Sequence, residues 1–290
     1  MSKKNEKVIR IIPRLDIKGP NLVKGIHLEG LKILGDPQVF AKHYYDFGAD
    51  ELLYIDSVAS LYGRNSLANI IEETVQEIFI PFAVGGGIRK LDDIYNILRK
   101  GADKVAINTQ AVLTPELITE SAKKFGSSTI IIEIQTQRQL DNKYYAFIDN
   151  GRTNSNLEAV DWAKRAEDLG AGEILITSID KDGTGLGFEL DIISEIASKV
   201  SIPIIASGGA GKINHINDLA ENSQINGIGL ASILHYHFVK KMLNADYKVK
   251  NEGNFEIVGD NFDNKRIKTT NIKIIKDMLI KSGFICRPID

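Results

Sequence analysis

The sequence has little of three things that would place it in a special class of protein. Its 290 residues include one cysteine, Cys286, so the chain can form no internal disulfide and offers no cysteine-based metal site. Lysine and arginine (36) nearly balance aspartate and glutamate (38), and a net charge of −2 does not suggest nucleic acid or an acidic membrane surface as a partner. Neither a membrane span nor a signal peptide is visible. We expect a cytoplasmic protein.

Short runs rich in Ile, Val and Leu alternate with stretches of helical periodicity, which is typical of buried parallel strands and amphipathic helices. We predict eight strands, at Val8–Leu15, Glu51–Ile55, Ile80–Val84, Lys104–Ile107, Thr129–Ile134, Glu173–Thr177, Ile202–Ala206 and Ile225–Leu230. A last helix is expected at about Asn271–Ser282, after a polar insertion at roughly 244–270 that is too short for a core of its own. The chain, residues 1–290, is therefore expected to form one domain.

The chain contains an internal repeat. Phe47–Asp56 matches Leu169–Ser178, and Ile80–Gly87 matches Ile202–Gly209, both at an offset of 122 residues. Each half, approximately residues 8–125 and 126–290, holds four strand–helix units and cannot close a sheet alone. The prediction is an α/β fold, a (β/α)8 TIM barrel with half-barrel duplication. The alternative is an open doubly wound sheet, but no G-x-G-x-x-G follows the first strand and an open sheet needs no equivalent halves.

Glycine, hydroxyl and amide residues follow the strands at equivalent places in the two halves. They are Gly85, Gly86 and Gly87 with Asn108 and Thr109 in the first half, and Ser207, Gly208 and Gly209 with Ala231 and Ser232 in the second. In a barrel these loops build the site, and glycines beside N–H and O–H donors suit a phosphate. One such run is commonly only a turn. Its duplication favours two phosphate cradles and an elongated ligand with a phosphate at each end.

Asp16 ends the first predicted strand, where it could act as a general acid or base or simply form a turn. At an offset of 119 residues the repeat places Gln135 at the equivalent position. Glutamine forms hydrogen bonds but exchanges no proton at neutral pH, so a site that needs two carboxylates would lack one. Asp56, Asp180 and Asp182 also lie near strand ends, where they could orient a sugar or form ordinary turns.

Charged residues of alternating sign begin four strands at the opposite mouth: Arg10, Glu51, Lys104 and Glu173. They could close a ring of ion pairs, and taken alone they indicate no more than a stabilising surface network. His235 and His237 have no third converging ligand. No metal site and no cofactor are predicted.

Motifs from Arg10 to Gly211 resemble those of one known family. They include Arg10-Ile11-Ile12-Pro13, Leu22-Val23-Lys24-Gly25, Gly35-Asp36-Pro37, Val84-Gly85-Gly86-Gly87-Ile88, Gly101-Ala102-Asp103-Lys104-Val105, Ile107-Asn108-Thr109, Thr177-Ser178-Ile179-Asp180, Asp182-Gly183-Thr184 and Ala206-Ser207-Gly208-Gly209-Ala210-Gly211. Together they resemble the HisF family, the cyclase subunit of imidazole glycerol phosphate synthase, and more distantly its isomerase relative in histidine synthesis.

The resemblance implies a HisH-like glutaminase partner that docks on the N-terminal face of the barrel and sends ammonia through it. The family's reaction joins ammonia to a phosphoribulosyl formimino carboxamide nucleotide, giving imidazole glycerol phosphate and an aminoimidazole carboxamide ribotide. By motif, Asp16 matches the first catalytic aspartate, and Asp103 matches the partner interface. Lys24, Asp56, Thr177, Asp182, Gly183 and the two cradles match substrate and phosphate sites, whereas Arg10, Glu51, Lys104 and Glu173 match the ammonia gate. The family also suggests that Lys18–Lys32 is a mobile loop that closes over the substrate.

Two departures from the family lie inside the barrel. Where the family has Ala-Ile-Asp-Ala-Lys-Arg, this chain has Glu133-Ile134-Gln135-Thr136-Gln137-Arg138, so Gln135 replaces the second catalytic aspartate, and Arg14 stands where a cysteine is usual. Losing a positioned acid commonly costs about 10²–10⁴ in rate.

Three functions fit these residues. The sequence favours an ammonia-fed paralogue acting on another phosphorylated sugar-derived substrate, as in HisF-like proteins that help to form amidino sugars for surface glycans. The alternative is a histidine-pathway cyclase that relies on Asp16 and water. The second alternative is a non-catalytic metabolite-binding activator of a glutaminase.

Overall fold

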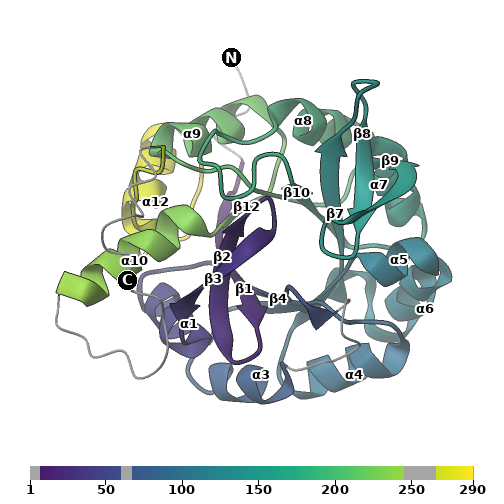
Figure 1. Ribbon diagram of the computed structural model, residues 1–290, viewed down its shortest axis with the longest axis horizontal. Coiled ribbons are helices and arrows are strands. Elements are labelled where there is room, and N and C mark those ends of the chain that lie inside the picture. The colour runs from purple at the N-terminus through teal and green to yellow at the C-terminus, as the bar shows by residue number, and fades with distance from the viewer. Residues whose placement is uncertain (1–6, 60–66, 245–265, 290) are drawn as a thin grey trace.

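A computed structural model describes residues 7–59, 67–244 and 266–289 of the chain, and its centre is a closed parallel barrel (Figure 1). The barrel strands are β1 (Arg10–Lys18), β4 (Leu52–Asp56), β5 (Phe82–Gly85), β6 (Lys104–Ile107), β7 (Ile130–Arg138), β10 (Glu173–Ser178), β11 (Ile204–Ser207) and β12 (Gly227–Leu230). Each pairs in parallel with its neighbours, and the β7–β10 and β12–β1 pairings close the ring. The predicted eight-stranded barrel is confirmed.

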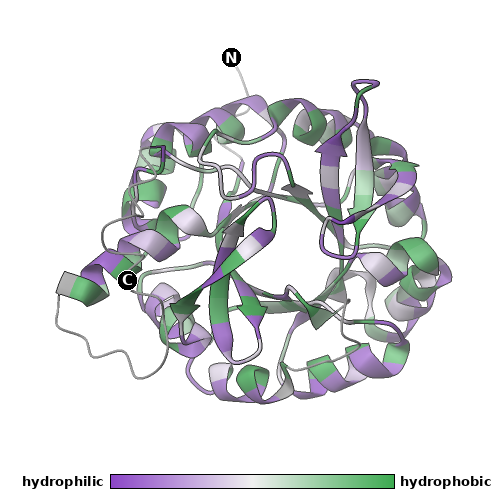
Figure 2. Cartoon of the chain, in the orientation of Figure 1, coloured by the Kyte–Doolittle hydropathy of each residue, from purple (hydrophilic) through white to green (hydrophobic). Residues whose placement is uncertain are grey.

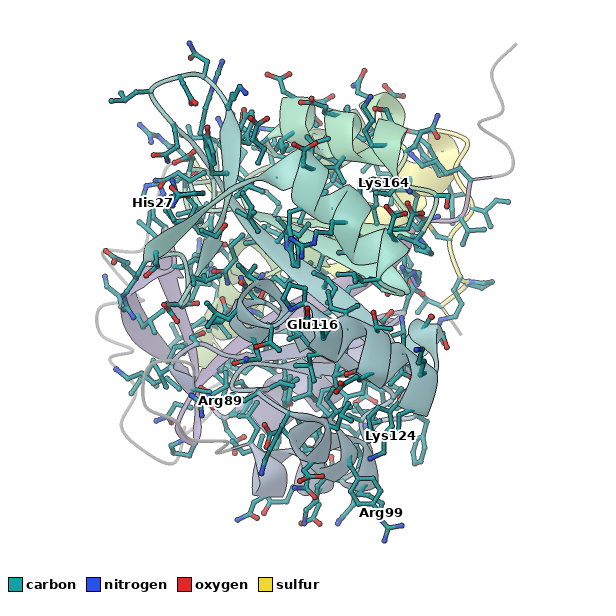
Figure 3. All side chains as sticks on the ribbon, turned by 90° about the vertical axis from the view of Figure 1, so that its right-hand side faces the viewer. His27, Arg89, Arg99, Glu116, Lys124 and Lys164 are labelled. Carbon is teal, nitrogen blue, oxygen red and sulfur yellow. The ribbon has the colours of Figure 1, made fainter. Side chains whose placement is uncertain are left out.

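A ring of helices covers the outside of the barrel. They are α1 (Pro37–Asp46), α3 (Ala68–Thr74), α4 (Leu91–Arg99), α5 (Thr109–Leu113), α6 (Glu116–Phe125), α7 (Ala159–Asp168), α8 (Leu190–Lys199), α9 (Ile213–Asn222), α10 (Ser232–Asn244) and α12 (Ile272–Lys281), with a 3-10 turn at Ser127–Thr129. Each turns an apolar stripe toward the strands, and Figure 2 shows hydrophilic and hydrophobic residues side by side along the ring. Charged side chains such as Arg99, Glu116 and Lys124 point outward (Figure 3). No helix in the described ranges is long and apolar enough to cross a membrane.

The strands bury side chains on both of their faces, which explains their continuous apolar runs. Outward-facing residues pack beneath the helices in the main core, where Trp162 of α7 is the largest fully buried side chain. Inward-facing residues form a separate apolar layer across the barrel, made of Ile12, Leu53, Ile55, Ala83, Ala106, Ile131, Leu175 and Ile205. This layer, called here the inner layer, separates the charged N-terminal mouth from the C-terminal mouth.

Two antiparallel hairpins follow equivalent strands of the two halves. The strands β2 (Asn21–Ile26) and β3 (Glu29–Gly35) follow β1, and β8 (Tyr144–Ile148) and β9 (Thr153–Glu158) follow β7. Most of Lys18–Lys32, which was expected to be a loop, is therefore a β-hairpin, and its closure over a substrate stays a prediction. The hairpin was hard to read because Lys24, a charged residue, is buried in the middle of β2.

The structure repeats the two-fold pattern of the sequence. Strands β5 and β11 begin 122 residues apart, and each is followed by two glycines with positive φ: 98° and 71° at Gly86 and Gly87, and 94° and 106° at Gly208 and Gly209. The equivalent backbone shapes support half-barrel duplication.

The predicted last helix is present as α12, whereas most of the insertion at 244–270 lies outside the described residues. Where the chain is described again, the N–H of Lys268 donates to the carbonyl of Gly211 (2.7 Å), and the N–H of Thr270 donates to that of Ile233. Helix α12 is tied to the barrel by the Lys276 ammonium, which lies 2.6 Å from Asp50 Oδ1. After the insertion the chain therefore returns to the same barrel.

The inner layer should contribute strongly to stability. Leu175 is fully buried in it, so Leu175→Ala removes packed methyl groups and leaves a cavity that costs about 2–5 kcal/mol in the free energy of unfolding. Leu140, at the exposed tip between β7 and β8, provides the control, because Leu140→Ala should change the free energy of unfolding by less than about 0.5 kcal/mol. Urea unfolding measures both, and similar midpoints for the two variants would contradict this account.

Candidate active site

A closed ring of ion pairs lies at the N-terminal ends of the strands. The Arg10 guanidinium contacts Glu51 (Nη1–Oε2 2.6 Å) and Glu173, and the Lys104 ammonium contacts Glu51 Oε1 and Glu173 Oε2, each at 3.0 Å. The two carboxylates are buried and the two cations are partly exposed. The four charges found in the sequence therefore form one ring across the barrel entrance.

Asp103 lies beside this ring, exposed at the residue that precedes β6. Its Oδ2 accepts a hydrogen bond from the N–H of Phe82 at 2.9 Å, and Asp50 accepts one from the N–H of Ile11 in the same way. These bonds satisfy backbone donors at the strand ends. They leave Asp103 on the face that surrounds the ring.

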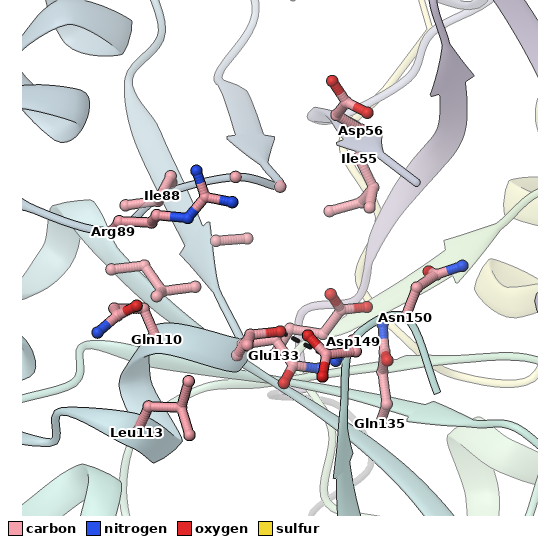
Figure 4. Close-up of a pocket in the computed structure, with 16 residues that line it drawn as sticks. Ile55, Asp56, Ile88, Arg89, Gln110, Leu113, Glu133, Gln135, Asp149 and Asn150 are labelled. Atoms are coloured by element: carbon pink, nitrogen blue, oxygen red, sulfur yellow. Dashed lines mark hydrogen bonds between the residues drawn. The ribbon is translucent and has the colours of Figure 1, made fainter. Parts of the chain in front are cut away.

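A pocket opens at the other mouth, beside the cradle of the first half (Figure 4). Its lining includes Gly86, Gly87, Asn108, Thr109, Asp56, Glu133 and Gln135, whereas Gly85 ends β5 just outside it. A Cβ on Gly86 would lie 2.5 Å from the carbonyl oxygen of Asp56, so the chain needs glycine there. Asn108 Nδ2 is buried and has no hydrogen-bond partner among the described residues. The cradle thus combines a backbone at Gly86 that has no room for a side chain with the Nδ2 donor of Asn108.

The second cradle has the same backbone form at the end of β11. A Cβ on Gly208 would lie 2.9 Å from the carbonyl oxygen of Ser178, and Ser178 stands 122 residues after Asp56. Ser207 and Ser232 are buried beside it, and Ala231 immediately precedes α10. These residues do not line the first pocket. The two glycine turns therefore share one backbone form at separate places on the mouth, and their binding of phosphate stays a prediction.

Asp16 is held by a buried ion-pair chain. Its Oδ2 lies 3.1 Å from Lys24 Nζ, which lies 2.7 Å from Asp182 Oδ2. All three side chains are at most 5% exposed, and Gly183 lets the chain pass close to the carbonyl of Gly25. Three residues proposed from the sequence are thus in direct contact at the mouth.

A second buried chain of contacts, which sequence reasoning missed, runs through Arg14. The guanidinium donates from Nε to Asp16 Oδ1 (2.9 Å), and from Nη1 to Glu133 Oε1 (2.9 Å) and Thr177 Oγ1 (2.7 Å). The signal was present in the repeat, because Arg14 and Glu133 are 119 residues apart, as are Asp16 and Gln135. Arg14 and Glu133 both depart from the family motif, carry opposite charges and stand at equivalent positions of the two halves, which indicates an ion pair.

These contacts set the protonation of the site. Burial by itself would raise the pKa of Asp16, but the Lys24 ammonium and the Arg14 guanidinium outweigh it and hold that pKa well below its ordinary range. Burial would likewise lower the pKa of Lys24, but Asp16 and Asp182 raise it above the ordinary value. Asp16 is therefore a carboxylate, and Lys24 a cation, at neutral pH.

Further residues of the mouth come from the hairpins and from the loop after β5. Arg89, Asp149 and Asn150 line the first pocket and were absent from the sequence prediction. Asn150 Nδ2 donates to the carbonyl of Leu28, so the tips of the two hairpins meet at the mouth. Their only sequence signal was the turn composition around Asn150.

Comparison with known proteins agrees with this geometry. Residues 10–240 match the family of histidine biosynthesis proteins. The chain is 53% identical over 209 residues to the imidazole glycerol phosphate synthase subunit HisF of Legionella pneumophila, covering 72% of this chain and 99% of that protein. It is 42% identical over 247 residues to the HisF subunit of Bacillus cereus strain Q1, covering 83% and 98%. The chain belongs to the HisF family.

Membership of the HisF family, whose named relatives are synthase subunits, confirms that this chain is an enzyme subunit. The preference for a surface-glycan paralogue finds no support, because the named relatives belong to imidazole glycerol phosphate synthase. In the described parts of the chain no three His, Cys, Asp or Glu side chains group as metal ligands. His235 lies outside the barrel and contacts the backbone of β1.

His235 holds β1 against α1 and α10. Its Nε2–H donates to the carbonyl of Arg14 at 2.9 Å, and its Nδ1 lies 2.6 Å from the Tyr44 hydroxyl, which donates to it. Burial lowers the pKa of His235 to about 4. The unfolded chain, in which this pKa is near 6.5, therefore takes up the proton first as the pH falls.

Stability should consequently fall between pH 6.5 and pH 4. In His235→Gln the side-chain amide can still donate to the carbonyl of Arg14, but it does not titrate. The free energy of unfolding of the wild type, minus that of the variant, should therefore fall by up to about 3 kcal/mol from pH 7 to pH 4. Urea unfolding across this range measures it. His237→Gln, at a half-buried position on the same helix, should give a smaller change, and a pH-independent difference for His235→Gln would refute the account.

Proposed function

We propose that this chain is the cyclase subunit of an imidazole glycerol phosphate synthase. It adds ammonia to the phosphoribulosyl formimino carboxamide ribotide of histidine synthesis and yields imidazole glycerol phosphate and an aminoimidazole carboxamide ribotide. The main support is the position of Asp16, a buried carboxylate at the mouth of a barrel whose two halves each carry a glycine cradle. The relatives' names agree with this reaction.

The two cradles suit the two phosphates of this substrate. Backbone N–H groups beside Gly86 and Gly87 and the free Nδ2 of Asn108 would bind one phosphate, and those beside Gly208 and Gly209 the other. An elongated bisphosphate held at both ends would cross the mouth above Asp16. Its reacting centre would then be fixed relative to one carboxylate.

The ring of ion pairs is the proposed entrance for ammonia. It encircles the N-terminal mouth, and the inner layer lies between it and Asp16. Neutral ammonia can cross an apolar layer more easily than ammonium, because a charge pays a large desolvation penalty. A glutaminase docked on this face, against exposed Asp103, would deliver ammonia without loss to water.

Turnover with external ammonia tests the proposed reaction without a partner. The purified chain with saturating ammonium salt at alkaline pH should convert the ribulotide into both products, identified by mass spectrometry, at a rate proportional to protein. Asp16→Asn should lower kcat by about 10²–10⁴, because an amide cannot exchange the proton. Lack of turnover by the wild type, with binding of a bisphosphate analogue intact, would overturn the proposed function.

The gate can be tested by comparing two ammonia sources. Arg10→Ala opens the ring, so turnover driven by glutamine and a partner glutaminase should fall several-fold relative to turnover driven by ammonium salt, since ammonia can escape. Lys164→Ala, on the outer face of α7 (Figure 3), removes an exposed cation of no expected consequence. An unchanged ratio in Arg10→Ala would argue against a gate.

A further inference from the structure

We propose that Glu133 is the second carboxylate of the site and that it works with the Gln135 amide to receive ammonia and move its protons. The inference rests on the proposed function and concerns how the reaction proceeds without an aspartate at position 135. Two structural facts about the described residues carry it: hydrogen bonds reach Oε1 of Glu133 but none reaches Oε2, and the acceptor oxygen of Gln135 is buried with no donor among them.

Glu133 and Gln135 occupy successive inward positions on β7. Side chains alternate along a strand, so residues two apart point to the same side, with Glu133 one step closer to the N-terminal entrance. Both side chains line the pocket beside the first cradle (Figure 4). Ammonia arriving from the entrance would meet Glu133 first and Gln135 next.

The contacts of Glu133 fix one of its oxygens and leave the other available. Oε1 accepts hydrogen bonds from Arg14 Nη1 at 2.9 Å and from Thr177 Oγ1 at 3.2 Å. Within the described residues Oε2 has no hydrogen bond, and the side chain reaches the pocket. A carboxylate held through one oxygen is positioned and can still take a proton on the other.

Gln135 supplies a binding group for the incoming nucleophile. Its side chain is 2% exposed, and Oε1 has no hydrogen-bond donor among the described residues. A buried acceptor without a donor is costly, and a ligand N–H would relieve that cost. Ammonia offers three such N–H groups. When Gln135 Oε1 accepts a hydrogen bond from one of them, the lone pair on the ammonia nitrogen stays free to react.

The proton movements balance with these groups alone. The ammonia lone pair forms a bond to the ketone carbon of the ribulosyl group, the C=O π electrons move to oxygen, and Glu133 Oε2 takes a proton from nitrogen and returns it to that oxygen. A second proton passes from nitrogen to the hydroxyl by the same path, water leaves and a C=N bond forms. Each step returns Glu133 to its carboxylate form.

Arg14 is the positioning residue that makes Glu133 tolerable in the barrel. An unpaired carboxylate in this interior would pay a heavy desolvation cost, and the guanidinium offsets it while also binding Asp16. One cation therefore holds two carboxylates from equivalent strands of the two halves. The site therefore has two carboxylates, Asp16 and Glu133, and Glu133 lies closer to the N-terminal end of the barrel than position 135 does.

Glu133→Gln tests the proposal with a nearly isosteric change. With ribulotide and ammonium salt, kcat should fall about 10²–10⁴ while KM and the affinity for a bisphosphate analogue stay within about twofold. Glu158→Gln is the matched control, because this glutamate pairs with Lys143 on the exposed face of β9 and should leave turnover unchanged. Retained turnover in Glu133→Gln would overturn the inference.

A rescue separates a chemical role from a structural one. Adding Gln135→Asp to Glu133→Gln moves the carboxylate to the family position and should regain at least about tenfold of the lost kcat. Should Glu133→Gln misfold because Arg14 loses one of its two carboxylate partners, Arg14→Ala with Glu133→Ala removes both charges of that pair, and this variant should bind the analogue but turn over slowly.

The outcomes distinguish this inference from the proposed function. Wild-type turnover together with full turnover in Glu133→Gln, or in the variant that combines Arg14→Ala with Glu133→Ala, sinks the inference alone. A loss of turnover that parallels a loss of analogue binding also sinks it, because Glu133 would then be structural. No turnover by wild type overturns the proposed function and this inference with it.

Discussion

The structure depends on the closure of eight parallel strands around one narrow interior. Once β7 pairs with β10, every inward side chain shares that space with the inward side chains of seven other strands. A charge placed there has little or no access to water and is best neutralised by a charge on another strand. Arg10 with Glu173 at the entrance, and Arg14 with Glu133 near the mouth, are two solutions of this constraint.

The same closure divides the barrel into layers with different chemistry. The N-terminal end carries a ring of ion pairs, the inner layer is apolar, and the mouth supplies carboxylates and amides. Because strands advance about 3.3 Å per residue, two positions along β1 or β7 separate one layer from the next. Chemistry in this site is therefore controlled by which inward position of a strand carries the acid.

Sequence alone was sufficient for the parts that repeat. Eight apolar runs predicted the strands, and the glycines after β5 and β11 predicted two equivalent turns, because positive φ and close backbone approach favour glycine there. The hairpins were missed since Lys24 interrupts β2, and its charge is explained only by Asp16 and Asp182 across the mouth. Contacts between residues far apart in sequence, such as Arg14 with Glu133, need the closed barrel.

The two halves have kept their backbone and diverged in their charges. Gly86 and Gly208 stand at equivalent places because a Cβ on either would meet a backbone oxygen at the end of a strand, Asp56 or Ser178, which cannot move without disturbing that strand. Inward side chains are freer, provided that charges change in balancing pairs, and Arg14 and Glu133 are such a pair at equivalent positions of the halves. The lack of an aspartate at position 135 thus leaves a carboxylate in the pocket, because Glu133, the next inward residue of the same strand, also lines it.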